Sequence, residues 1–218
     1  MHHTKCTYKD ACYHLNDLLL RNSTVSTLVL SGCQIGPKGA AKLHDGISNS
    51  ATLNTLDLSD CNIQNDGLER VTAAVCNNNS LEDLSLRDNH LHESCTDTLL
   101  NLVSCSKTLR RLNLSWNSLY SAKLWRRLVR ALESNVVLVD LDFSWNALGK
   151  ECVRFLRLLL LRSQTLKRLT LNGKISNEHL LELGEHVLYC FQEIDFTMKK
   201  LLSSREVWRG IMFSKNCI

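Results

Sequence analysis

The chain has 218 residues, of which 44% are apolar and only one is proline, and its formal net charge is +4. This length and composition suit one well-packed domain and exclude a disordered chain. No apolar run reaches the roughly eighteen residues that a membrane span needs, and residues 1–10 are too polar for the core of a signal peptide. We therefore expect a cytoplasmic protein with no membrane partner.

Residues 1–21 precede a repeated pattern and are predicted to form an N-terminal capping helix. Over residues 22–197 the pattern L-x-x-L-x-L-x-x-N/C-x-L recurs, with five complete copies, a sixth from Leu166 and a fragment from Phe191. The complete copies are separated by 28, 28, 28 and 29 residues and begin at Val25, Leu53, Leu81, Leu109 and Leu138. Residues 198–218 lack the pattern and form either a C-terminal cap or a tail.

This period leaves room in each copy for a short strand and a helix of three to four turns. The sequence therefore predicts an α/β fold, a right-handed leucine-rich-repeat solenoid with a concave parallel sheet and convex α-helices. A coiled coil would instead show a period of about seven residues. Apolar positions also align from helix to helix, as in the set Leu43, Val71, Leu99, Leu128 and Leu156.

Each position in the repeat has an expected role. Leucines at the fourth and sixth positions should point inward, and the Asn or Cys at the ninth should satisfy unpaired backbone groups of the loop. Cysteine can do this only weakly. Because Cys33 and Cys61 occupy this inward position, we expect all ten cysteines to be reduced. Three glycosylation sequons, at Asn22, Asn78 and Asn113, are interpreted as chance.

The string LxLSxNxL followed by a long helix resembles the ribonuclease-inhibitor-like class of leucine-rich repeats, and the resemblance covers residues 22–197. The class includes the inhibitor itself, sensor ends of NOD-like receptors, tropomodulin, the Ran GTPase-activating protein and several ciliary proteins. Its members share a curved parallel sheet that binds other proteins. The resemblance implies a protein partner without naming it.

The third, fifth and seventh positions alternate with the buried leucines and should face the concave surface. This surface is small and polar, and it offers either a solvated sheet or a shallow groove for a partner. The candidate binding residues on it are Arg87, Arg111, Asn113, Asp140, Asp142 and Arg168.

The eighth position carries Trp116 in one repeat and Trp145 in the next. Both precede the inward asparagine, so they should stack as neighbours at the rim. Two adjacent exposed tryptophans are favoured as interface anchors, and the alternative is that the rings only pack over the loop.

The charges are segregated along the chain. Residues 1–106 hold 7 basic and 12 acidic residues, and residues 107–168 hold 13 and 4. Without interleaved aromatic residues we expect no nucleic-acid partner. The basic helices, with Arg126, Arg127, Arg130 and Arg154, form either a solvated convex face or a docking site for an acidic surface such as that of tubulin.

The helix predicted to contain Phe155, Leu158 and Leu161 has a second apolar face, which another segment should bury. The C-terminal stretch is too apolar for a free tail, and we expect it to cap this end of the solenoid, with a partner-binding segment as the alternative.

No phosphate loop, metal-binding Cys/His spacing or nucleophile elbow occurs, so we expect no enzyme activity, cofactor or metal. The chain is expected to be a protein-interaction scaffold in the cytoplasm, in a cytoskeletal or ciliary assembly. The alternative is a GTPase activator resembling that of Ran. The oligomeric state and the partner's identity stay open.

Overall fold

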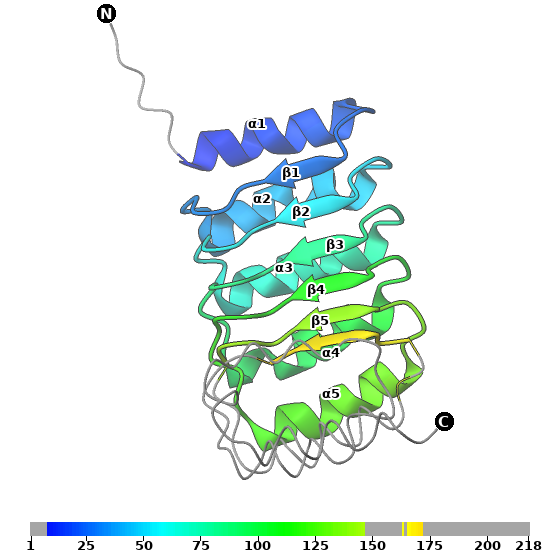
Figure 1. Cartoon of the computed structure of the whole chain (residues 1–218). Coiled ribbons are helices and arrows are strands. Elements are labelled where there is room, and N and C mark those ends of the chain that lie inside the picture. The colour runs from blue at the N-terminus through cyan, green and yellow to red at the C-terminus, as the bar shows by residue number, and fades with distance from the viewer. Residues whose placement is uncertain (1–7, 147–162, 164, 172–218) are drawn as a thin grey trace, which may run out of the picture.

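The computed structural model describes residues 8–146, 163 and 165–171. Over this part the chain forms one parallel sheet whose strand order follows the sequence. The strands are β1 (Thr27–Val29), β2 (Thr55–Asp57), β3 (Asp83–Ser85), β4 (Arg111–Asn113), β5 (Asp140–Asp142) and β6 (Arg168–Thr170). Figure 1 shows the strands stacked one above another, each one repeat further along the chain.

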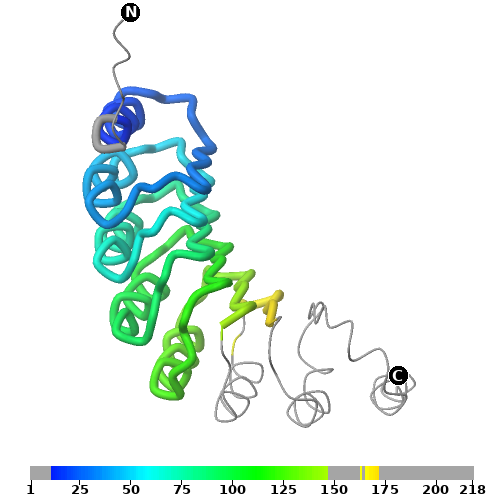
Figure 2. Tube along the Cα trace, turned by 90° about the vertical axis from the view of Figure 1, so that its left-hand side faces the viewer, coloured from blue at the N-terminus to red at the C-terminus, as the bar shows by residue number. Residues whose placement is uncertain are grey.

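Helices alternate with the strands and lie on the other side of the molecule from the sheet, as the side view in Figure 2 shows. They are α1 (Tyr8–Arg21), α2 (Gly36–Asn49), α3 (Gln64–Asn77), α4 (Thr96–Cys105) and α5 (Ala122–Ser134), with a 3₁₀ turn, η1 (Glu93–Cys95), before α4. Pro37 lies in the first turn of α2, where a missing N–H costs nothing. The predicted leucine-rich-repeat solenoid is confirmed.

The register of the sheet is one repeat per strand, so equivalent leucines pair across it: Leu28 with Leu56, Leu56 with Leu84, and Leu84 with Leu112. The fourth and sixth positions are buried from the second repeat onward, as predicted, and Leu56, Leu58, Leu84 and Leu86 are all 0% exposed. Stacked leucines from consecutive repeats therefore form one continuous core between sheet and helices.

Helix α1 covers the first end of this core. Its own side chains Cys12 and Leu19 are buried, and the Asn16 side-chain oxygen accepts a 2.6 Å hydrogen bond from the Gly46 N–H of α2. A Cβ atom on Gly46 would lie 2.8 Å from the Asn16 carbonyl oxygen, so only glycine allows the two helices to approach this closely.

Asparagines at the ninth position link successive loops as the sequence predicts. The Asn89 side-chain oxygen accepts the N–H groups of Cys61 and Ile63 at 3.1 and 3.0 Å, and its amide donates to the carbonyls of Leu58 and Arg87 at 2.7 and 3.0 Å. Each such asparagine provides hydrogen-bond partners for backbone groups in the loop of the preceding repeat and in its own loop. This ladder continues through Asn117 and Asn146.

Cysteine at the same position does less. The Cys61 thiol donates to the Leu30 carbonyl at 3.0 Å, but it gives the first loop no oxygen acceptor. The Cys33 and Ile35 N–H groups instead bond within their own loop, to the carbonyls of Leu30 and Cys33. Burial raises the pKa of the Cys61 thiol to about 12, so this thiol stays protonated.

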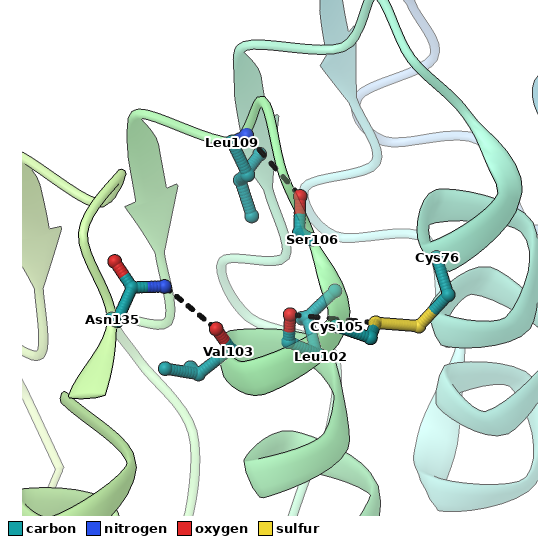
Figure 3. Close-up of a disulfide and its surroundings, with 7 residues drawn as sticks. All are labelled: Cys76, Leu102, Val103, Cys105, Ser106, Leu109 and Asn135. Atoms are coloured by element: carbon teal, nitrogen blue, oxygen red, sulfur yellow. Dashed lines mark hydrogen bonds between the residues drawn. A yellow bond between two sulfur atoms is a disulfide. The ribbon is translucent and has the colours of Figure 1, made fainter.

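A second ladder lies three residues before each repeat begins. In all six copies an Asn or Ser side-chain oxygen there accepts the N–H of the first repeat residue, and the donors are Val25, Leu53, Leu81, Leu109, Leu138 and Leu166. The Asn78 amide also donates to the carbonyls of Ile47 and Ser50, at the end of the preceding helix, both at 2.8 Å. Figure 3 shows the matching contacts of Asn135 with Val103 and of Ser106 with Leu109.

The expectation that every cysteine is reduced is wrong for one pair. Cys76 at the end of α3 and Cys105 at the end of α4 form a disulfide, with Cα atoms 5.3 Å apart (Figure 3). The sequence places both residues near helix ends one repeat apart, but spacing alone does not show that the side chains meet. The free cysteines of the described residues are Cys12, Cys33, Cys61 and Cys95.

Several expectations lie outside the described residues. They concern the apolar helix face of Phe155, Leu158 and Leu161, the degenerate last repeat and the C-terminal segment 198–218.

Candidate protein-interaction surface

Trp116 and Trp145 stack against each other at the rim, as the repeat predicts. Their ring centroids lie 4.8 Å apart with 27° between the planes, and the residues remain 45% and 51% exposed. The pair follows the ends of the neighbouring strands β4 and β5. Within the described residues neither indole N–H has a hydrogen-bond acceptor.

The backbone at this rim position is left-handed. The φ angle is 57° at both tryptophans, and it is 77°, 52° and 54° at Gly32, Asp60 and Asp88, which occupy the same position in the first three repeats. Gly, Asn and Asp tolerate this conformation, whereas a bulky residue loses about 1 kcal/mol or more in it. Trp116 and Trp145 therefore stand where the backbone disfavours them.

Arg87 joins the pair from the preceding repeat. Its guanidinium carbon lies 5.5 Å from the centroid of the Trp116 ring, a cation–π distance. Arg87, Trp116 and Trp145 thus form one exposed group, which we call the tryptophan rim.

The charged candidates Arg111, Asp140 and Arg168 lie at the opposite end of the strands. Arg111 donates to Asp83 at 2.9 Å and Arg168 donates to Asp140 at 2.9 Å, giving alternating charges across β3 to β6. Burial raises the pKa of Asp140, although Arg168 and Arg111 act against this shift. We call these four residues the charge ladder.

The seventh-position residues are not all open to the concave face, which corrects the expectation. Ser59, Ser115 and Ser144 are only 7%, 3% and 3% exposed. Their N–H groups donate to the side-chain oxygens of the fifth-position residues Asp57, Asn113 and Asp142, each at 2.9 Å. These local bonds turn the chain at the strand end, so Asn113 and Asp142 have a structural role beside any binding role.

The structure thus places the candidate residues in two groups. Trp116, Trp145 and Arg87 lie together beyond the strand ends, whereas the charge ladder stands five positions before the tryptophans in the repeat, at the start of the strands. Asn113 and Asp142 lie between the two groups, at the strand ends. The charge ladder residues already pair with one another. The tryptophan rim is therefore the part of the set with unused interaction capacity.

The convex basic face is also partly engaged. Arg126 and Arg130 on α5 are exposed, but Arg127 forms an ion pair with Asp97 of α4. Arg154 lies outside the described residues.

Sequence reasoning missed two kinds of residue. Asp60 and Asp88 stand in the same row as the tryptophans, and counting the eighth position in every repeat would have found them. The Asn/Ser ladder was missed because Asn22 and Asn78 were considered only as sequons. Asn78 is 2% exposed and bonded through both ends of its amide, so it is a structural residue.

In the part of the chain that the structure describes, no group of three or more His, Cys, Asp or Glu side chains could hold a metal ion. No helix among these residues is both long and apolar enough to span a bilayer.

A family model and one solved structure support the fold. A leucine-rich-repeat family model matches residues 21–43, 49–71 and 105–119. The structure of the tropomodulin C-terminal domain of Caenorhabditis elegans aligns with a TM-score of 0.53 and 17% identity, over 83% of this chain and 92% of that one. That of actin-binding site 2 of leiomodin-1 aligns with a TM-score of 0.47 and 13% identity, over 81% and 87%. A search of curated proteins found no significant match.

Proposed function

We propose that this chain is a non-catalytic scaffold of the ribonuclease-inhibitor-like class, which binds a partner protein through the concave face and its rim. The observation that carries the proposal is the pair of stacked tryptophans, each about half exposed and each in a left-handed backbone conformation. Exposed aromatic surface and a disfavoured backbone both cost free energy. Such costs are typical of functional surfaces, where aromatic anchors supply most of the binding energy.

The remaining candidates contribute around this anchor. Arg87 extends the aromatic surface, and Arg111, Asn113, Asp140, Asp142 and Arg168 line the strands behind it. Because the charge ladder is internally paired, we assign it to orientation and specificity more than to affinity. A cytoplasmic setting in a cytoskeletal or ciliary assembly is part of the proposal and is supported by family resemblance only.

The test replaces both tryptophans by glycine, the residue that the first repeat has at this position. Tagged wild-type chain and the Trp116→Gly/Trp145→Gly variant are used to capture partners from the native cell, followed by mass spectrometry. Partners bound at the rim should be lost with the variant, and affinity for a purified one should fall roughly thirtyfold, about 2 kcal/mol. Tyr13→Ala with Val136→Ala is the matched control, because these side chains are 64% and 78% exposed elsewhere.

The convex basic face is the alternative surface, and the exposed Arg126 and Arg130 support it. If α5 docks on an acidic surface, Arg126→Glu with Arg130→Glu should abolish binding while the glycine variant binds normally. A GTPase activator predicts faster GTP hydrolysis by a GTPase on addition of the chain. Hydrolysis at the basal rate would exclude the GTPase activator and favour the scaffold function.

A further inference from the structure

The rim position forms a row that follows the ends of the four neighbouring strands β2 to β5. Its members are Asp60, Asp88, Trp116 and Trp145, with φ angles of 52°, 54°, 57° and 57°. Since these residues share nearly the same φ angle and the same position in the repeat, we expect their side chains to leave the chain in similar directions. We call this set the acidic-aromatic row.

Hydrogen bonds between successive loops fix the spacing of the row. The Asp60 N–H donates to the Arg87 carbonyl at 2.8 Å, the Asp88 N–H to the Ser115 carbonyl at 3.0 Å, and the Trp116 N–H to the Ser144 carbonyl at 2.9 Å. These bonds continue the sheet pairing, so neighbours stand one strand spacing of about 4.8 Å apart, and the row spans roughly 14 Å.

The two carboxylates of the row differ from the others along the sheet. Asp57 and Asp142 bond to strand-end serines, and Asp83 and Asp140 bond to arginines. For Asp60 and Asp88 the described part of the chain provides neither an ion pair nor a side-chain hydrogen bond. Asp60 is exposed and Asp88 half-buried, so both charges are available to a partner.

The aromatic half of the row is equally available. Arg87 carries a positive charge at this edge, but it lies over the Trp116 ring and forms no ion pair with Asp60 or Asp88. The row therefore ends in two negative charges on one side and in a half-exposed indole stack on the other.

We propose that the acidic-aromatic row binds a peptide segment in which lysine or arginine stands two to four residues from an apolar anchor residue. The anchor packs on Trp116 and Trp145, and the basic side chain pairs with Asp60 and Asp88. The centres of the two halves are two strand spacings apart, about 10 Å, which an extended peptide covers in three residues at about 3.3 Å each. An acidic segment would place like charges together and be repelled. This inference rests on the proposed function and adds the chemistry of its partner.

The experiment selects binders from a phage-displayed library of random twelve-residue peptides on the full chain. Selection is repeated on Asp60→Asn/Asp88→Asn, which removes the charges but keeps residues that tolerate a left-handed backbone, and on Trp116→Gly/Trp145→Gly. Asp66→Asn with Glu69→Gln is the matched control, since it removes two exposed charges from α3.

We expect selected peptides to share an aromatic or aliphatic residue with lysine or arginine two to four positions away. Synthetic versions should lose about tenfold in affinity on the asparagine variant at low salt, with a smaller loss at high salt, because salt screens exposed charges. They should bind the control like the wild type and the glycine variant at least thirtyfold more weakly.

The other outcomes separate the two proposals. Peptides that need the tryptophans but show no basic residue, or that bind the asparagine variant unchanged, overturn the inference and leave the proposed function standing. Both the inference and the proposed function are overturned if no peptide is enriched over an unrelated protein. They are also overturned if the selected peptides bind Trp116→Gly/Trp145→Gly as tightly as the wild type.

Discussion

The eighth and ninth positions of the repeat are neighbours in the chain but have opposite environments. The ninth points inward, where Asn89 is 0% and Asn117 7% exposed, and across the five complete copies it varies only between Asn and Cys. The eighth points outward, and it varies from Gly to Asp to Trp. A side chain that must satisfy buried backbone groups has few chemical options, whereas one at the rim is free to serve a partner.

Among the substitutions considered, Asn117→Ala at the ninth position should cause the largest loss of stability. The Asn117 oxygen accepts the N–H groups of Asn89 and Leu91, both at 3.0 Å, and its amide donates to three carbonyls. Two buried N–H groups left without acceptors cost about 1–3 kcal/mol each, so we expect unfolding free energy to fall by about 4 kcal/mol. Denaturant unfolding measures this, with the exposed Ser118→Ala as control. A loss similar to that of the control would show that the ladder is not structural.

The disulfide joins the ends of α3 and α4 and adds a covalent link between two repeats to the hydrogen bonds of the Asn/Ser ladder. Cys76 and Cys105 close a loop with a sequence separation of 29. A loop of this size predicts about 3.5 kcal/mol of stabilisation, so Cys76→Ser/Cys105→Ser should lower the free energy of unfolding by that amount. Reductant should lower the stability of the wild type and leave the variant unchanged. If oxidised and reduced wild type unfold at the same denaturant concentration, the disulfide is absent in solution.

Much of this architecture could be predicted from the sequence because it follows from periodicity. The inward leucines, the asparagine ladder and the stacked tryptophans each repeat at one position, so counting places them. Counting does not place the Cys76–Cys105 pair, because its separation of 29 is one residue more than the 28-residue period of these repeats. The ion pairs of Asp83 and Asp97 depend on side-chain reach, which a repeat pattern does not encode.

Cys61→Asn should stabilise the chain at the ninth position, where cysteine now provides the fewest hydrogen bonds to the neighbouring loop. Asparagine would offer the first loop an oxygen acceptor, as Asn89 does for the second. We expect the free energy of unfolding to rise by about 1 kcal/mol, the usual net gain from an added hydrogen bond. A loss would show that the first loop cannot adopt the conformation of the others.

The same variant has a pH dependence. The Cys61 pKa is about 12 in the folded chain because the thiol is buried, against an ordinary value of 9.0. An unfolded thiol ionises first, so the wild type loses stability as pH rises from 9 toward 12, and the advantage of Cys61→Asn should grow over this range. A constant difference across this range would contradict the raised pKa.

The smallest effect on stability is expected at the rim. Trp116→Gly or Trp145→Gly loses a stacking interaction of about 0.5–1.5 kcal/mol and the flexibility cost of glycine, but it relieves about 1–2 kcal/mol of left-handed strain. These terms nearly cancel, so each variant should unfold within about 1 kcal/mol of the wild type, while partner binding weakens. Denaturant unfolding and binding must be measured on the same preparations. A stability loss of 2 kcal/mol or more, matching the loss in binding, would show that the tryptophans hold the loops together, and the interface would then lie elsewhere on the solenoid.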